Sequence, residues 1–169
     1  MISFLQVQTN EHKQYVKELF LEYMEYVRQN LLQEFGFDFE VEPYVEEDMK
    51  KLHNLLPPNG RLLLVQVDDQ IAGVGALRQI GESMGEIKRM YIRPAIQSRG
   101  LGRKLLEGLI AEARQIGYTK LRLDVGFYAT SAEKLYRSVG FTEIDPYLES
   151  EAPPEVHSKW KFMEISLKR

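Results

Sequence analysis

The chain has 169 residues, 44% of them hydrophobic, and a formal net charge of −3, which is typical of one globular domain with a hydrophobic core. The lack of a strongly basic charge argues against a nucleic-acid partner, and the absence of cysteine excludes disulfides, thiolate metal sites and a cysteine nucleophile. The length predicts a single domain over residues 1–169. No window approaches the roughly 18 apolar residues of a membrane span, so we expect no membrane partner and a cytoplasmic location.

The first third of the chain predicts a strand followed by two helices. Residues 2–7 alternate as a short strand, and Asn10 is expected to cap a long amphipathic helix over about residues 11–33. Its apolar residues follow the spacing of one helix face: Tyr15, Val16, Leu19, Phe20, Tyr23, Met24, Val27 and Leu31. A second helix is expected from about Pro43 to Leu55.

The middle of the chain predicts three strands. Two strand-like runs flank Asp68-Asp69-Gln70, which indicates a hairpin. Gly73 and Gly75 lie inside the second run, where glycine usually marks a bulge or a close backbone approach. A turn follows near residues 81–85, and the next strand, "GEIKRMYIRP", ends at Pro94.

The last third alternates helices and strands. A helix is expected from Leu101 to a cap at Gly117, then the strand "KLRLDV" and a short helix, "TSAEKLYRSVG", closed by Gly140. Two further strands are expected at about residues 141–144 and within "KWKFMEISLKR". The order of elements predicts one layered α/β or α+β fold.

A glycine-rich turn before the third expected helix indicates an anion site. Gly100 and Gly102 allow a ligand to approach the backbone closely, and the first amides of a helix are free donors at the positive end of its dipole. Three cations, Arg99, Arg103 and Lys104, gather at this unfavourable end, which a bound phosphate would explain. The alternative is a tight turn with solvated side chains. Neither the Walker loop nor the dinucleotide fingerprint fits this spacing.

Three segments resemble the GNAT acetyltransferase superfamily. Residues 97–102, "QSRGLG", match its Gln/Arg-x-x-Gly-x-Gly/Ala signature, "GEIKRMYIRP" is similar to its central strand, and "AEKLYRSVGF" is similar to its later helix. The resemblance implies a mixed, strongly twisted sheet of about seven strands with about four helices. It also implies a V-shaped splay between two central parallel strands, at about residues 86–93 and 120–125.

The same resemblance implies acetyl-CoA as cosubstrate. The pyrophosphate is expected on the backbone amides of residues 98–103, and the pantetheine alongside the strand at residues 90–92. The implied coenzyme-binding residues are Met90, Tyr91, Ile92, Gln97, Ser98, Arg99, Gly100, Leu101, Gly102, Arg103, Lys104 and Ser131. Ala129 departs from the family, which often has asparagine there, so that hydrogen bond is lost or moved to Thr130 or Ser131.

The expected reaction is acetyl transfer to a primary amine, with Tyr136 and Glu86 as catalytic residues. Tyr136 matches the family tyrosine that protonates or hydrogen-bonds the coenzyme thiolate; the alternative is that it only packs on the sheet. Glu86 begins the central strand and would accept the amine proton; the alternative is an exposed strand-end carboxylate. In an unbroken strand Glu86, Lys88, Met90 and Ile92 share a face, unless a bulge resets the register.

Direct attack on the thioester is the simpler route without cysteine, and a serine or threonine acyl-enzyme stays open as the alternative. No metal is expected, because His12, His53 and His157 are scattered and are interpreted as surface residues.

The acceptor is expected to be a small-molecule or peptide amine. The acidic and aromatic segment at residues 34–44 and the glutamates Glu149, Glu151 and Glu155 suit a cationic amine, although a solvated acidic loop explains them as well. An alternative function is a catalytically weak acyl-CoA-binding sensor or interaction module, and another is a general nucleotide-phosphate binder. A homodimer is possible, with the apolar strand "FMEISL" contributing.

Overall fold

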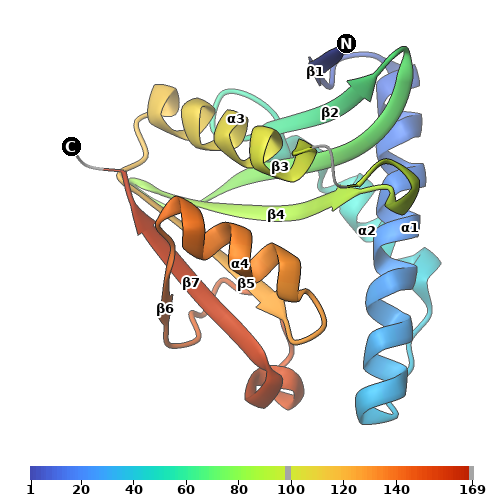
Figure 1. The fold of residues 1–169 in the computed structure, drawn as a ribbon, viewed down its shortest axis with the longest axis vertical. Coiled ribbons are helices and arrows are strands. Elements are labelled where there is room, and N and C mark those ends of the chain that lie inside the picture. Colours follow the sequence, from blue (N-terminus) through green and yellow to red (C-terminus); the bar gives the residue numbers. More distant parts are fainter. Residues whose placement is uncertain (98–99, 168–169) are drawn as a thin grey trace.

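The computed structural model describes residues 1–97 and 100–167, which form a seven-stranded sheet with helices on both faces (Figure 1). Along the sheet the strand order is β1-β2-β3-β4-β5-β7-β6. The strands are β1 Ile2–Gln6, β2 Arg61–Val67, β3 Gln70–Gly81, β4 Met84–Ile92, β5 Lys120–Gly126, β6 Thr142–Ile144 and β7 Trp160–Ser166. All neighbours are antiparallel except β4 and β5, so the sheet is mixed, as predicted.

The helices cover the two faces of the sheet in pairs. Helices α1 (Asn10–Phe35) and α2 (Val41–Lys50) pack with Leu62 and Leu64 of β2 on one face. Helices α3 (Leu101–Ile116) and α4 (Thr130–Val139) pack with Leu63 and Val65 on the other. Successive residues of β2 thus point into opposite cores, which is why its sequence reads as a continuous hydrophobic run.

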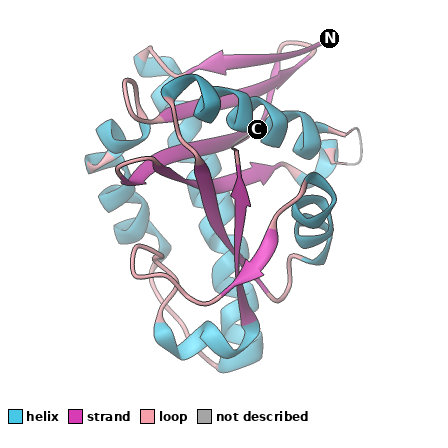
Figure 2. Cartoon of the chain, turned by 90° about the vertical axis from the view of Figure 1, so that its left-hand side faces the viewer, coloured by secondary structure: helices cyan, strands magenta, loops and turns pink. Residues whose placement is uncertain are grey.

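The two central strands separate after a short parallel pairing. Register between β4 and β5 covers only residues 84–86 and 120–122. Figure 1 shows the two strands starting side by side and then diverging. In Figure 2 the upper strands run across the view, whereas the lower ones lie at a steep angle to them. The predicted V-shaped splay and strong twist are therefore confirmed.

A bulge in β4 resets its register. Val74 pairs with Tyr91 and Ala76 with Lys88, so two β4 residues lie opposite one β3 residue. Arg89, one of those two, has a φ of +57°, a left-handed conformation that side chains rarely adopt. Consequently the single face expected for residues 86, 88, 90 and 92 is not kept. Ile87, Met90 and Ile92 all belong to the core beneath α3 and α4.

Three local predictions need correction. Thr9, not Asn10, caps α1: its hydroxyl accepts from the His12 amide, and the His12 ring accepts from the Thr9 amide. The second helix begins two residues before Pro43 and ends at Lys50, followed by a separate 3-10 turn at Leu52–Leu55.

The last strand lies inside the sheet rather than at its edge. Residues 162–164 of β7 pair with β5 on one side and β6 on the other. The backbone of these three residues is therefore paired on both sides within the chain.

Candidate functional site

A pocket of about 740 Å³ opens where β4 and β5 separate. Its walls come from residues 87–92 of β4 and 123–126 of β5, with further residues from α1, α3 and α4. We call this cavity the V pocket. It lies at the interruption of the sheet, where ligands of open sheets commonly bind.

The N-terminus of α3 forms one end of the V pocket. Gly100 takes the left-handed conformation with a φ of +71°, and it offers no side chain to cap the helix. The first turn of α3 contains no acidic residue, while Arg103 lines the pocket. Its guanidinium donates to the Ser138 hydroxyl of α4 at 2.6 Å. Among residues 1–97 and 100–167 no side chain caps the start of α3, and this arrangement of helix amides and a positioned cation suits an anion.

Most of the residues predicted to hold the coenzyme line the V pocket together. They are Met90, Tyr91, Ile92, Gln97, Gly100, Leu101, Gly102, Arg103 and Ser131. Lys104 is exposed on the flank of α3 and does not line it. Ser98 and Arg99 lie outside the described residues. Ala129 begins α4 without a side-chain cap, and its neighbour Thr130 lines the pocket with Ser131.

Tyr136 is buried in the wall that α4 gives to the V pocket. Its hydroxyl points at the sulfur of Met90 on β4, 4.0 Å away, and its ring packs on Phe141. Burial raises the pKa of Tyr136 well above its usual value. The hydroxyl therefore stays protonated at neutral pH and can donate a hydrogen bond or a proton.

Glu86 lies at the vertex of the V, opposite Arg122 of β5. It is 3% exposed, unlike the strand-end carboxylate considered above. One carboxylate oxygen accepts from Arg78 Nε at 2.7 Å and the other from the Tyr147 hydroxyl at 2.7 Å. Glu86 does not itself line the V pocket.

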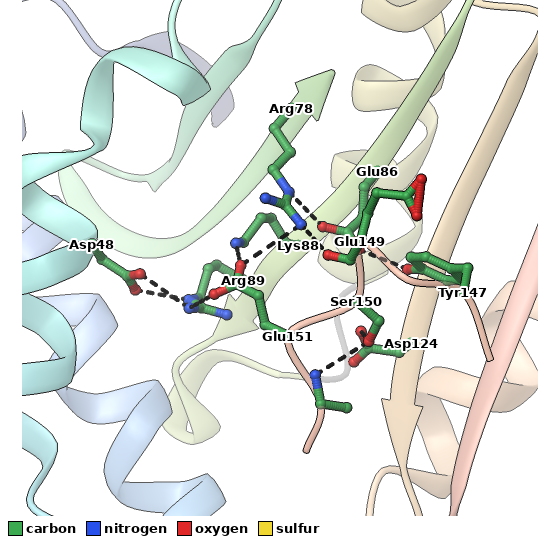
Figure 3. A network of polar contacts seen from close by, with 11 residues as sticks. Asp48, Arg78, Glu86, Lys88, Arg89, Asp124, Tyr147, Glu149, Ser150 and Glu151 are labelled. Atoms are coloured by element: carbon green, nitrogen blue, oxygen red, sulfur yellow. Dashed lines mark hydrogen bonds and ion pairs between the residues drawn. The ribbon is translucent and has the colours of Figure 1, made fainter. Parts of the chain in front are cut away.

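A network of charged groups extends from Glu86 towards α2 (Figure 3). Lys88 and Arg89 of β4 line the V pocket, and Arg89 donates to Asp48 of α2. Burial and the guanidinium groups of Arg89 and Arg78 lower the pKa of Lys88 to about 7. Figure 3 shows the carboxylate of Glu151 lying among these cations.

Two features of the V pocket were missed by the sequence reasoning. Asp124 of β5 lines it and accepts hydrogen bonds from Trp160 Nε1 at 3.0 Å and the Ser150 hydroxyl at 2.8 Å. An aromatic wall, made of Tyr23, Tyr26, Tyr128 and Trp160, also lines it. Alternation within "KLRLDV" pointed only to a strand, and Tyr23 was indistinguishable from core.

The acidic and aromatic segment after α1 lies elsewhere. Asp38, Phe39, Glu40 and Glu42 line a separate hollow of about 500 Å³ with Arg28. Glu151 of the later loop does not line the V pocket either, but its carboxylate is paired with Lys88 and Arg89, which do. Residues 34–44 therefore do not contribute to the wall of the V pocket. Among the described residues no His, Asp or Glu side chains are grouped as metal ligands.

The histidines and the helices can also be compared with the sequence predictions. His157 is half-buried, with its ring centroid 4.9 Å from that of Phe162, whereas His53 is exposed as expected. Within residues 1–97 and 100–167, no helix is long and apolar enough to cross a membrane.

Comparisons with known proteins agree with this geometry. The family model described as acetyltransferase (GNAT) family matches residues 18–141. The chain is 33% identical over 106 residues to an IAA acetyltransferase of Azospirillum brasilense, covering 62% of this chain and 69% of that one. It is 30% identical over 134 residues to an uncharacterised N-acetyltransferase of Schizosaccharomyces pombe, covering 78% and 82%. The PaiA N-acetyltransferase of Thermoplasma acidophilum, solved with coenzyme A, matches with a TM-score of 0.74 at 19% identity, covering 98% and 99%.

Proposed function

The chain belongs to the acetyltransferase (GNAT) family, and we propose that it transfers the acetyl group of acetyl-CoA directly to a primary amine of a small molecule or peptide. One observation carries this proposal. A single pocket joins an uncapped helix N-terminus, which suits a phosphate, to a buried phenol and a carboxylate, which suit proton transfer. Acetyl-CoA would supply the activated acetyl thioester.

The residues of the V pocket fit a coenzyme A molecule. The backbone amides at the start of α3 and the Arg103 guanidinium would bind the pyrophosphate. Residues 90–92 of β4 lie beyond the three positions that pair with β5. An extended amide-bearing chain can therefore hydrogen-bond to β4 as a further strand would. The coenzyme A in the PaiA relative supports this proposal.

Tyr136 is proposed as the group that assists the leaving sulfur. As the C–N bond forms and the C–S bond breaks, the sulfur takes the electron pair of the broken bond. The protonated hydroxyl of Tyr136 donates a hydrogen bond, or its proton, to that sulfur. Its position against Met90 places the donor beside the β4 segment proposed for pantetheine.

The amine proton has two candidate acceptors. Glu86 is the carboxylate at the position the family motif suggests, and it would act through an intervening group because it does not line the V pocket. Asp124 is a second candidate, favoured by its place in the pocket wall. Either carboxylate would leave the amine neutral and able to attack the thioester carbonyl.

An acceptor screen tests the proposed function. The protein is incubated with acetyl-CoA and a panel of amines, amino acids, polyamines and peptides, and free thiol is measured. We expect thiol release that depends on the amine, together with an acetylated product of the matching mass. Tight binding of coenzyme A without transfer to any amine would instead favour the alternative function, an acyl-CoA sensor or interaction module.

A further inference from the structure

Three cationic side chains gather around Glu151, and two of them, Lys88 and Arg89, also line the V pocket. Arg78 comes from β3, and Lys88 and Arg89 come from β4. Their side chains are only 24%, 12% and 10% exposed. Removing so many charges from water is costly unless each is paired. The partners of these cations therefore indicate what the site is built to hold.

Two of the three cations have fixed partners. Arg78 pairs with Glu86 at 2.7 Å, and Glu86 is buried in the sheet. Arg89 pairs with Asp48, whose side chain is 15% exposed on α2. These pairs join elements on both sides of the site and fix the two guanidinium groups, and Arg78 Nη2 also donates to the Glu149 carbonyl of the loop that carries Glu151.

Lys88 is the remaining cation, and its partner is of a different kind. Among residues 1–97 and 100–167 the ion pair of Lys88 is with Glu151 alone. Glu151 belongs to the loop between β6 and the 3-10 turn at Pro154–Lys159, and its side chain is 43% exposed. The same carboxylate lies 3.6 Å from Arg89 and 4.0 Å from Arg78. A single exposed carboxylate thus occupies the focus of three buried cations (Figure 3).

We propose that this focus is the binding site for a carboxylate of the acceptor, and that Glu151 is displaced when the acceptor enters. The acceptor is then an aminocarboxylate, such as a free amino acid, whose carboxylate pairs with Lys88 and Arg89 while its amine faces the thioester. This inference rests on the proposed function and names the substrate class of the same site. Displacement exchanges one carboxylate for another, so the charge of the cluster is unchanged.

The aromatic wall indicates which aminocarboxylates fit. Arg89 lies 6.0 Å from the ring centroid of Tyr23, so the carboxylate site adjoins the wall. The rings of Tyr26 and Tyr128 are 5.2 Å apart, and those of Tyr128 and Trp160 are 5.7 Å apart. Aromatic faces favour an apolar or aromatic side chain. A polyamine, in contrast, would place additional positive charge beside Lys88 and Arg89.

Matched substrate pairs test the proposal. Thiol release is measured with L-leucine and L-leucinamide, with L-phenylalanine and its amide, and with 4-aminobutyrate and its amide. For each pair the ratio of the two KM values is compared between wild type and variants, so that the different pKa values of the amines cancel. Lys88→Met is expected to raise the KM ratio of acid to amide by about ten-fold or more, because only the acid uses the lysine.

Glu151 gives the sharper arm of the experiment. Glu151→Gln removes the competing carboxylate, so we expect the KM for the amino acid to fall about three- to ten-fold relative to the amide. Glu155→Gln is the matched control, because it removes an exposed glutamate of the adjacent 3-10 turn, outside the cluster. The control should leave the ratio as in wild type.

The possible failures are distinguishable. Equal changes in the KM for acid and amide in Lys88→Met and Glu151→Gln would overturn the inference. So would a higher KM for the acid in Glu151→Gln, because Glu151 would then be a fixed part of the site. In both cases the proposed acetyl transfer would still stand. Absence of thiol release with every amine would overturn the proposed function itself.

Discussion

Arg89 donates two hydrogen bonds to the carboxylate of Asp48, from Nε at 2.9 Å and from Nη2 at 3.1 Å, and so joins the bulge of β4 to α2. Asp48 raises the pKa of Arg89 against the opposing effect of burial, and the guanidinium therefore stays charged. The bond also holds a residue whose backbone has a φ of +57°. Both the conformation of the bulge and the direction of the Arg89 side chain depend on this pair.

Replacing Asp48 should therefore destabilise the protein. Asp48→Asn leaves a buried guanidinium without its carboxylate, and we expect the free energy of unfolding to fall by about 3 kcal/mol. Urea denaturation measures the change. Glu47→Gln is the control, because Glu47 forms an exposed pair with Lys50 and its loss should cost less than about 0.5 kcal/mol. Equal losses in the two variants would contradict the role given to the pair.

Tyr136→Phe should lower turnover without weakening coenzyme binding. The substitution removes only the hydroxyl and keeps the ring contact with Phe141. We expect kcat to fall about 100-fold, as for the loss of a general acid, with the Kd for coenzyme A within about three-fold by calorimetry. Tyr118→Phe removes a partly buried hydroxyl that donates to the Asn59 carbonyl, away from the V pocket, and should keep kcat. Full activity in Tyr136→Phe would refute the assignment.

Glu86→Gln and Asp124→Asn separate the two candidate proton acceptors. Loss of the group that takes the proton is overcome when the solution deprotonates the amine, so the defect of that variant should shrink as pH rises. We expect this recovery in Asp124→Asn, since Asp124 lines the V pocket. Glu86→Gln should also lower the free energy of unfolding, because it removes the buried partner of Arg78. Recovery in Glu86→Gln alone would assign the proton to Glu86.

Arg103 and Lys104 should differ in their effect on coenzyme affinity. Arg103 lines the V pocket and is held by Ser138, whereas Lys104 does not line it. Arg103→Gln is expected to raise the Kd for coenzyme A about three- to ten-fold, and Lys104→Gln less than about two-fold. Calorimetry with coenzyme A and with pantetheine measures both. Pantetheine lacks the phosphates and should bind both variants alike; a loss of pantetheine affinity would contradict a phosphate role for Arg103.

The KM for an aminocarboxylate acceptor should depend on the protonation of Lys88. Burial first, then Arg89 and Arg78, lower its pKa to about 7, while Glu86 and Asp48 act in the opposite direction, and Glu151 also faces the ammonium group. Only the protonated lysine attracts a carboxylate, so the KM for L-leucine should rise as pH increases from about 7 to 9. In Lys88→Arg the charge is kept throughout, and this rise should be absent. Identical KM profiles would show that Lys88 does not bind the acceptor.

Local patterns predicted the elements well where a single element determines them. Leu101, Leu105 and Leu109 follow helical spacing up to Gly117, and α3 matches this expectation. The order of three motifs then predicted the splayed sheet. The caps of elements could not be predicted to the residue: Thr9 and Asn10 are both good caps, and only the His12 contact in the structure distinguishes them.

The acceptor side of the site was not predictable because it depends on contacts between distant segments. The bulge at Arg89 places an ordinary residue in a left-handed conformation, for which the sequence offers no glycine. Glu151 meets Lys88 only through the path of the loop, so the sequence alone could not pair this glutamate with a cation of β4. Asp124 could have been noticed as the one acidic residue within its hydrophobic strand.

The short pairing of β4 with β5 also has a mechanical meaning. Three residues on each strand join the arms of the V directly, and these lie at the closed end. A ligand that bonds to β4 and to α4 at once braces the open end, far from that joint. Binding of such a ligand should therefore restrain both arms of the V. Deuterium exchange at the amides of β5 and β7 should slow when the ligand is bound to β4. The motion of one arm of the interrupted sheet would then depend on whether a ligand is bound to the other arm.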